Sequence, residues 1–153
     1  MAQLETYVVA MQKQGVLLPR ASVAEIIPYE PLQRIDETPV WFLGILGWRG
    51  LQVPVVSFEM LTVERASFSL VSVASASLVI VNGMTDPNGL PFYALVGQTM
   101  PRLVNLTEEM LFATGEEPGR TERARVRFED QVIAVPNLDF VEAAVTNVLV
   151  AND

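Results

Sequence analysis

Two pairs of adjacent acidic residues are the first candidates for chemistry in this chain, and they are Glu108-Glu109 and Glu116-Glu117. Hydrolysis of a glycosidic bond requires two carboxyl groups held a fixed distance apart. Both pairs sit in polar segments that imply no apolar pocket around them, and adjacent exposed acids ordinarily serve solubility and helix capping. We therefore interpret both pairs as surface acids.

An arginine-rich stretch is the second candidate. Arg123, Arg125 and Arg127 alternate along an expected strand and therefore share one face, and Arg120 lies just before them. Such a stripe could bind phosphate groups. However, five acids lie among or beside the four arginines, and they are Glu116, Glu117, Glu122, Glu129 and Asp130. We therefore favour a solvated strand face with cross-strand ion pairs.

Residue types on which most enzymes rely are missing from the sequence. The 153 residues include no cysteine and no histidine. The lack of cysteine excludes disulfides, thiolate nucleophiles and thiolate metal sites, and the lack of histidine removes the usual general base near neutral pH and the commonest zinc ligand. The sequence therefore predicts a protein that is not an enzyme and has no metal and no cofactor.

Charge and cysteine content also limit the partners and the compartment. The formal net charge is −8 at pH 7, and an acidic surface repels nucleic-acid phosphates and anionic lipid headgroups. A chain without disulfides suits the reducing cytoplasm. We therefore expect a cytoplasmic protein whose partners are other proteins and which binds no nucleic acid.

One uncharged stretch, residues 66–85, has about the length of a membrane span. It contains several serines and Asn82, and no cluster of cationic residues flanks it. We predict a loop that leads into a buried strand at residues 78–81, without insertion into a membrane.

Short apolar and aromatic runs recur along the chain and are interrupted by Gly, Pro or Asn-Gly, which is typical of an all-β protein. About ten such runs favour two small barrels or a sandwich. The predicted strands cover residues 7–11, 16–18, 23–27, 45–48, 53–57, 78–81, 92–96, 102–106, 126–128 and 132–135.

The turn and helix signals complete the pattern. The sequence Asp86-Pro87-Asn88-Gly89 predicts one hairpin and Glu129-Asp130-Gln131 a second. Thr107 is placed to cap a short helical turn. Asn137 is placed to cap a C-terminal helix, whose apolar stripe consists of Leu138, Val141, Val145 and Val148.

Three glycines, Gly44, Gly47 and Gly50, are spaced by threes among strand residues, so they do not form a phosphate-binding loop. We expect them to let the strands bend and to form a turn at Gly50. Trp48 and Arg49, which lie just before this turn, belong to the residue types that dominate protein interfaces. Trp48 is equally compatible with a place in the core.

The chain resembles the first half of the CheW domain in an ordered series of short motifs: Ile26-Ile27-Pro28-Tyr29, Arg34-Ile35, Thr38-Pro39, Gly44-Ile45, Arg49-Gly50 and Val53-Pro54-Val55-Val56. The strand at 78–81, the stretch at 93–106 and the sequence Ile133-Ala134-Val135 before a helix are similar to the second half. The resemblance covers nearly the whole chain.

This resemblance implies two packed five-stranded SH3-like β-barrels with a short C-terminal helix, forming one domain over residues 1–153. It implies a non-catalytic adaptor that couples a methyl-accepting chemoreceptor to a CheA-type histidine kinase. The kinase's regulatory domain would dock on one barrel, and the receptor's helical tip would enter a groove between the barrels. The acidic, cysteine-free chain also resembles the adaptors of the chemosensory system that controls type IV pili and twitching.

The resemblance places partner contacts at Val23, Glu25 and Arg49, and we add three nearby residues of the same expected strands. Glu25 and Arg49 carry opposite charges, so they are expected to pair if their strands are neighbours, shaping the surface more than stabilising the fold. The chain departs from the family at Gly47-Trp48, at Ser57 and next to Gly97. The predicted partner-binding residues are Val23, Glu25, Ile27, Leu46, Trp48 and Arg49.

A second interpretation is a β-barrel that binds a small ligand inside a barrel or between the two. That function would require a roomy apolar pocket with convergent polar groups. A filled barrel interior would argue against it. The sequence does not determine whether the chain self-associates.

Overall fold

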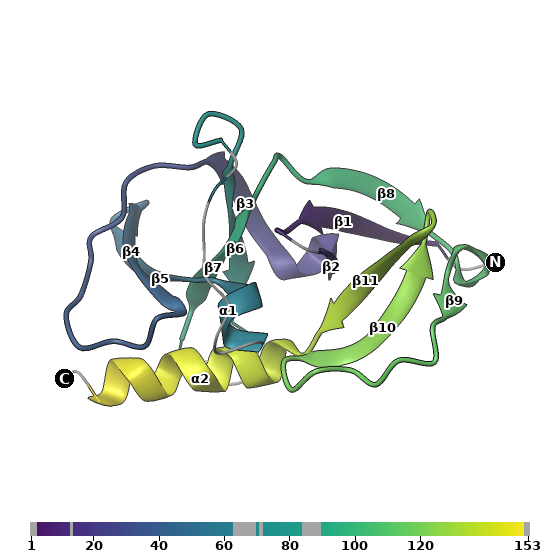
Figure 1. Ribbon diagram of the computed structural model, residues 1–153. Coiled ribbons are helices and arrows are strands. Elements are labelled where there is room, and N and C mark those ends of the chain that lie inside the picture. The colour runs from purple at the N-terminus through teal and green to yellow at the C-terminus, as the bar shows by residue number, and fades with distance from the viewer. Residues whose placement is uncertain (1–2, 13, 63–69, 71, 84–89, 152–153) are drawn as a thin grey trace.

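Two curled sheets and a long C-terminal helix make up the protein in a computed structural model (Figure 1). The structure describes residues 3–12, 14–62, 70, 72–83 and 90–151. The first sheet has the strand order β8-β1-β2-β11-β10-β9. Its strands are β1 (Leu4–Ala10), β2 (Gly15–Pro19), β8 (Arg102–Leu106), β9 (Phe112–Ala113), β10 (Glu122–Phe128) and β11 (Gln131–Pro136).

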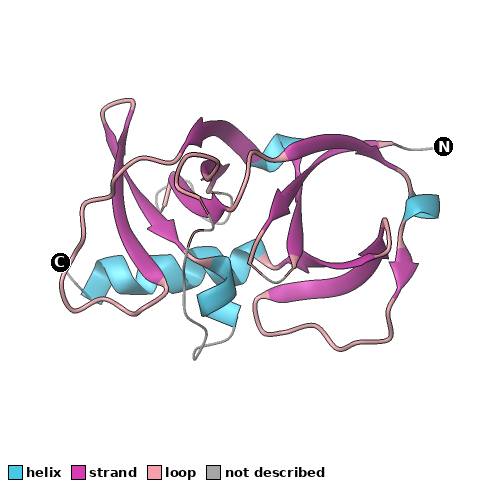
Figure 2. Cartoon of the chain, turned by 45° about the horizontal axis from the view of Figure 1, so that its top comes forward, coloured by secondary structure: helices cyan, strands magenta, loops and turns pink. Residues whose placement is uncertain are grey.

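The second sheet has five strands in the order β3-β6-β7-β5-β4. Its strands are β3 (Val23–Pro28), β4 (Phe42–Trp48), β5 (Leu51–Val56), β6 (Ser77–Asn82) and β7 (Phe92–Gly97). The chain enters this sheet through a 3-10 turn at Arg20–Ser22 and returns to the first sheet at β8. Figure 2 shows the two sheets curling side by side. The predicted all-β fold of two SH3-like barrels is confirmed.

Each of the ten predicted strands is present, with bounds that differ by a few residues. Three elements were not predicted, and the first is the 3-10 turn at Arg20–Ser22. Strand β9 spans only two residues, which is too short to show any periodicity, so the first sheet has six strands instead of five. Helix α1 (Phe58–Thr62) begins directly after β5, where the Oγ of Ser57 accepts a hydrogen bond from the backbone nitrogen of Met60.

The turn predictions had different outcomes. Strands β10 and β11 form the predicted hairpin, in which Glu129 and Asp130 have φ angles of 51° and 63°. The turn at Asp86-Pro87-Asn88-Gly89 lies outside the described residues. A 3-10 turn forms at Glu108–Met110, but the side chain of Thr107 makes no capping hydrogen bond, so that part of the prediction was wrong.

Helix α2 (Leu138–Ala151) confirms the predicted C-terminal helix and crosses beneath the second sheet (Figure 1). The Oδ1 of Asn137 accepts a hydrogen bond from the backbone nitrogen of Phe140 at 3.3 Å, as a helix cap does. Val141, Val145 and Val148 are buried. They pack against residues of both sheets, which are Val9, Val16, Leu18, Val79, Val81, Tyr93 and Leu95. The two sheets therefore share one core with α2.

Each sheet also encloses apolar side chains of its own. In the second barrel these include Leu46, Val53 and Ile80, which are at most 1% exposed. In the first barrel they include Leu17 and Ile133. These side chains occupy the barrel interiors, which argues against a small ligand bound inside a barrel. No helix among the described residues is long and apolar enough to cross a membrane.

A close backbone approach explains one of the three glycines. Gly44 has a φ of 148°, and its neighbour Ile45 exchanges two backbone hydrogen bonds with Gln33, at 2.8 and 2.9 Å. A Cβ atom on Gly44 would lie 2.7 Å from the carbonyl oxygen of Gln33. Gly47, three residues later on the same strand, has open space where its Cβ would stand.

We predict that Gly44→Ala lowers the free energy of unfolding by about 2 kcal/mol, because alanine is strained at this φ and its Cβ meets a backbone oxygen. Gly47→Ala on the same strand is the matched control and should change stability by less than about 0.5 kcal/mol. Equilibrium unfolding in urea measures both. Equal losses in the two variants would contradict this account of Gly44.

Candidate partner-binding surface

Three of the predicted residues meet where the two edge strands of the second sheet approach each other. Trp48 ends β4, and its Nε1 donates a hydrogen bond to the Oε1 of Glu25 on β3 at 2.6 Å. A terminal nitrogen of Arg49 lies 3.3 Å from the same oxygen. The guanidinium of Arg49 also stacks over the Trp48 ring, 4.7 Å from its centroid. We call this group the Glu25–Trp48–Arg49 cluster.

The cluster has a buried base and exposed charges. Trp48 is 8% exposed and packs edge-to-face against Phe92, with 4.9 Å between the ring centroids. The side chains of Glu25 and Arg49 are 37% and 66% exposed. The Trp48 ring is therefore a core residue, while the pair of opposite charges that it supports lies at the surface. The predicted pairing of Glu25 with Arg49 is present.

A tight turn sets the position of Arg49. Arg49 and Gly50 have φ angles of 50° and 76° and connect the paired residues Trp48 and Leu51 of β4 and β5. Positive φ at both central residues is the geometry of the two-residue hairpin turns that match strand twist. Arginine is strained at such a φ, and this conformation brings its guanidinium back over Trp48.

A β-bulge separates Val23 from Glu25. The pairing of β3 with β6 shifts register between these two residues. Val23 and Ile26 both pack against the core shared by the two sheets. Ile27 packs against the separate core of the second barrel. Simple alternation would have placed Val23 and Glu25 on one face. The bulge instead places them opposite Val81 and Ile80, which belong to different cores.

The six predicted residues therefore divide by burial. Leu46 is 1% exposed inside the second barrel, so its side chain presents no surface to a partner in this conformation. Val23, Glu25 and Ile27 are half-buried, and Arg49 is exposed. Partner contact by these residues stays a prediction. Sequence reasoning missed Phe92, whose ring supports Trp48 and which lies far away in the chain.

Two arginines of the arginine-rich stretch, Arg123 and Arg125, pair with acids, but these acids do not lie on the neighbouring strands as predicted. Arg123 pairs with Asp139 of α2 at 3.0 Å. Arg125 pairs with Glu122 of its own strand at 2.8 Å. Arg120 donates two hydrogen bonds, at 2.9 and 3.1 Å, to the carbonyl of Leu61 at the end of α1. Two of these three partners lie in helices, so alternation along a strand could not reveal them.

The described residues present no group of acids that could hold a metal ion. Glu108, Glu109, Glu116 and Glu117 are exposed, as predicted for surface acids. Two filled barrels on a shared core, with a preorganised charged cluster at the surface, define an interaction protein built on SH3-like barrels.

Comparisons with known proteins agree with this class. The CheW-like domain family matches residues 5–141. A crystal structure of the scaffolding protein TtCheW from Thermoanaerobacter tengcongensis superposes with a TM-score of 0.70 at 15% sequence identity, covering 90% of this chain and 86% of that one. The search of curated proteins found no match.

Because the match spans most of its length, the chain belongs to the CheW-like domain family. Members of this family are non-catalytic scaffolding adaptors of chemosensory signalling.

The hydrogen bond from Trp48 to Glu25 predicts a graded effect of substitution at Glu25. Glu25→Ala leaves the nearly buried Nε1 without its acceptor and should lower the free energy of unfolding by about 1 kcal/mol. Glu25→Gln keeps an oxygen acceptor while losing the charge, so its loss should be smaller. Urea unfolding of both variants at pH 7 measures the difference, and an equal loss would show that charge, not the hydrogen bond, matters.

Proposed function

We propose that this protein couples a methyl-accepting chemoreceptor to a CheA-type histidine kinase. The Glu25–Trp48–Arg49 cluster is the observation that carries the proposal. It joins two of the three positions that the family resemblance singles out, Glu25 and Arg49, on a tryptophan anchored in the core.

The cluster suits recognition because its charges are already ordered. Trp48 fixes Glu25 by a hydrogen bond and Arg49 by stacking. A partner that binds such a surface loses less side-chain entropy than one that must order free side chains. Opposite charges side by side also favour one orientation of the partner over others. We infer that the cluster sets which partner binds and in what register.

A second surface supports a separate contact with the kinase. The start of β1, the 3-10 turn at Glu108–Met110 and β9 gather at the end of the first barrel that is farthest from β4 (Figures 1 and 2). Three large apolar side chains are exposed on these elements: Leu4 at 55%, Met110 at 43% and Phe112 at 61%. Where exposed apolar groups form one contiguous patch, the patch marks an interaction site. We assign the kinase's regulatory domain to this end.

We further propose that residues 1–153 act as one domain, which the core shared by both sheets and α2 supports. The cytoplasm is the proposed compartment, because a chain without cysteines suits a reducing environment. Control of type IV pili is the proposed output, and the acidic, cysteine-free composition supports it.

The test is a pull-down from the native cell lysate with tagged wild-type protein, Glu25→Arg and Arg49→Ala. We expect wild type to retain a histidine kinase and a methyl-accepting receptor, identified by mass spectrometry. Both variants should lose the receptor, because Glu25→Arg reverses one charge of the cluster and Arg49→Ala removes the other. Arg49→Ala should unfold within about 1 kcal/mol of wild type, since an exposed ion pair contributes little to stability.

Arg123→Ala is the matched control, because Arg123 is also an exposed arginine paired with a carboxylate, but it lies opposite α2. It should retain both partners. If folded Arg49→Ala and Glu25→Arg bind as wild type does, the cluster is not the contact surface. If wild type retains neither a kinase nor a receptor, the proposed coupling itself is wrong.

A further inference from the structure

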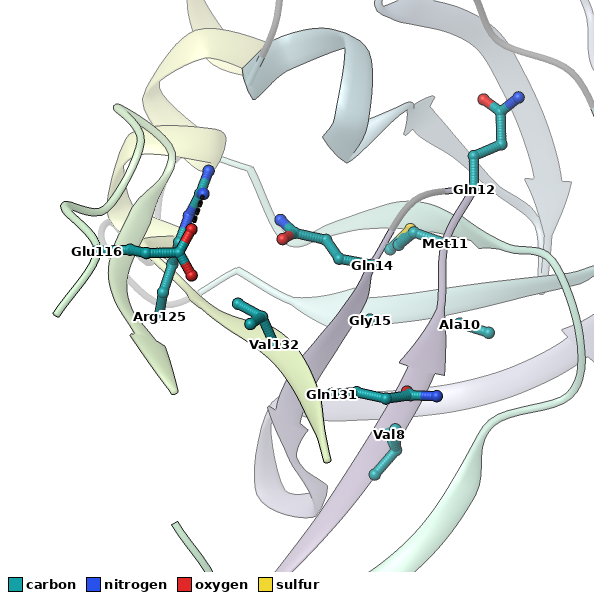
Figure 3. A pocket seen from close by; sticks show the side chains of 10 residues that line it. All are labelled: Val8, Ala10, Met11, Gln12, Gln14, Gly15, Glu116, Arg125, Gln131 and Val132. Carbon is teal, nitrogen blue, oxygen red and sulfur yellow. Dashed lines mark ion pairs between the residues drawn. The ribbon is translucent and has the colours of Figure 1, made fainter. Parts of the chain in front are cut away.

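A cavity of about 560 Å³ opens on the first barrel, and Figure 3 shows the side chains that line it. None of them belongs to the Glu25–Trp48–Arg49 cluster. The cavity lies between the turn that joins β1 to β2, the start of β11 and the loop before β10. The residues that line it are Val8, Ala10, Met11, Gln12, Gln14, Gly15, Glu116, Arg125, Gln131 and Val132.

The lining combines hydrogen-bond acceptors with an apolar wall. Gln14 and Gln131 bring side-chain amides to the cavity, and Glu116 brings a carboxylate from the loop (Figure 3). Val8 and Val132 contribute apolar surface to the same cavity. This combination fits a side chain that has an apolar stem and a polar tip.

Arg125 adds no net positive charge to the cavity, because a buried carboxylate neutralises it. The side chain of Glu122 is 0% exposed and accepts a hydrogen bond from the Nε of Arg125 at 2.8 Å. It also accepts bonds from the backbone nitrogen of Gly119 at 2.7 Å and from the Nε2 of Gln14 at 2.9 Å. The bond to Glu122 raises the pKa of the Arg125 guanidinium.

Glu116 supplies the remaining charge. Its Oε1 forms a long ion pair with the NH1 of Arg125, at 3.6 Å (Figure 3), and its side chain is 48% exposed. Since Glu122 and Arg125 cancel, the lining residues and the buried Glu122 together carry a charge of about −1 at neutral pH. An anionic ligand is therefore repelled, and a cationic group is attracted.

We propose that this cavity receives an arginine side chain presented by a protein partner. A guanidinium has five N–H donors, which suit the Glu116 carboxylate and the amide oxygens of Gln14 and Gln131. The methylene stem packs against the apolar wall. Several lining residues are exposed, so the site suits a side chain carried on a larger surface better than a free small molecule. The lining includes no residue of the Glu25–Trp48–Arg49 cluster and none of the exposed apolar residues assigned to the kinase contact, so this proposal does not depend on the proposed function.

The test uses the isotope-labelled full chain and three probes in low salt: acetyl-Gly-Arg-Gly-amide, acetyl-Gly-Glu-Gly-amide and agmatine. We expect the arginine peptide to shift the side-chain amide signals of Gln14 and Gln131 in NMR spectra in a saturable manner. The glutamate peptide should cause no saturable shift. Agmatine should bind more weakly than the arginine peptide, because it lacks the flanking peptide groups.

Two matched variants locate the effect. Glu116→Gln removes the charge of the cavity and should weaken binding of the arginine peptide by about fivefold. Glu117→Gln removes the same charge from the next residue, which does not line the cavity, and should leave binding unchanged. Both residues are exposed in a loop, so both variants should fold.

Three results would overturn the proposal. Saturable binding of the glutamate peptide would show that Arg125 recognises an anion instead. Tighter binding of agmatine than of the peptide would make the occupant a free small molecule. No saturable shift with the arginine peptide, or equal weakening by Glu116→Gln and Glu117→Gln, would show that the cavity is no arginine site.

Discussion

Val141, Val145 and Val148 of α2 pack against buried residues of both sheets, and the remaining features of the molecule rest on this contact. Each curled sheet is small, and its own interior holds few side chains. The shared core fixes one barrel relative to the other and buries Tyr93 completely. Desolvation, and then the nearby carboxylates of Glu142 and Asp139, raise the pKa of the Tyr93 hydroxyl. A surface that spans both barrels can be rigid only because this core is continuous.

On that support, the pair of charged groups Glu25 and Arg49 is ordered at the surface of the second sheet. The edge strands of the second sheet, β3 and β4, are bridged by the side chains of Glu25 and Trp48. The exposed ion pair adds little to stability. Together with the hydrogen bond from Trp48, it holds Glu25 and Arg49 in fixed positions, which suits the coupling role proposed above. The cavity on the first barrel uses the same principle, because buried Glu122 holds Arg125 in place.

Much of the candidate partner-binding surface could be predicted from the sequence, but the burial of its residues could not. The opposite charges of Glu25 and Arg49 and the resemblance to the CheW domain indicated the pair. Alternation along β3 failed at the bulge, since one extra residue reverses the faces of all that follow. Leu46 and Trp48 were expected at the surface or left open, and both proved to be core residues. Phe92 was missed because its contact with Trp48 joins residues far apart in the sequence.

The sequence by itself determined the elements whose signal is local: the ten strands, the β10–β11 hairpin, and α2 with its Asn137 cap. It also determined the family, because the order and spacing of the short motifs can be read from the sequence without knowing any contact in the structure. Only the tertiary structure decided the two-residue strand β9, the faces of Val23 and Glu25, and the carboxylate that holds Arg125. These features depend on which distant segments of the chain meet in space. Such contacts produce no periodic pattern of apolar residues in the sequence, so the sequence does not reveal them.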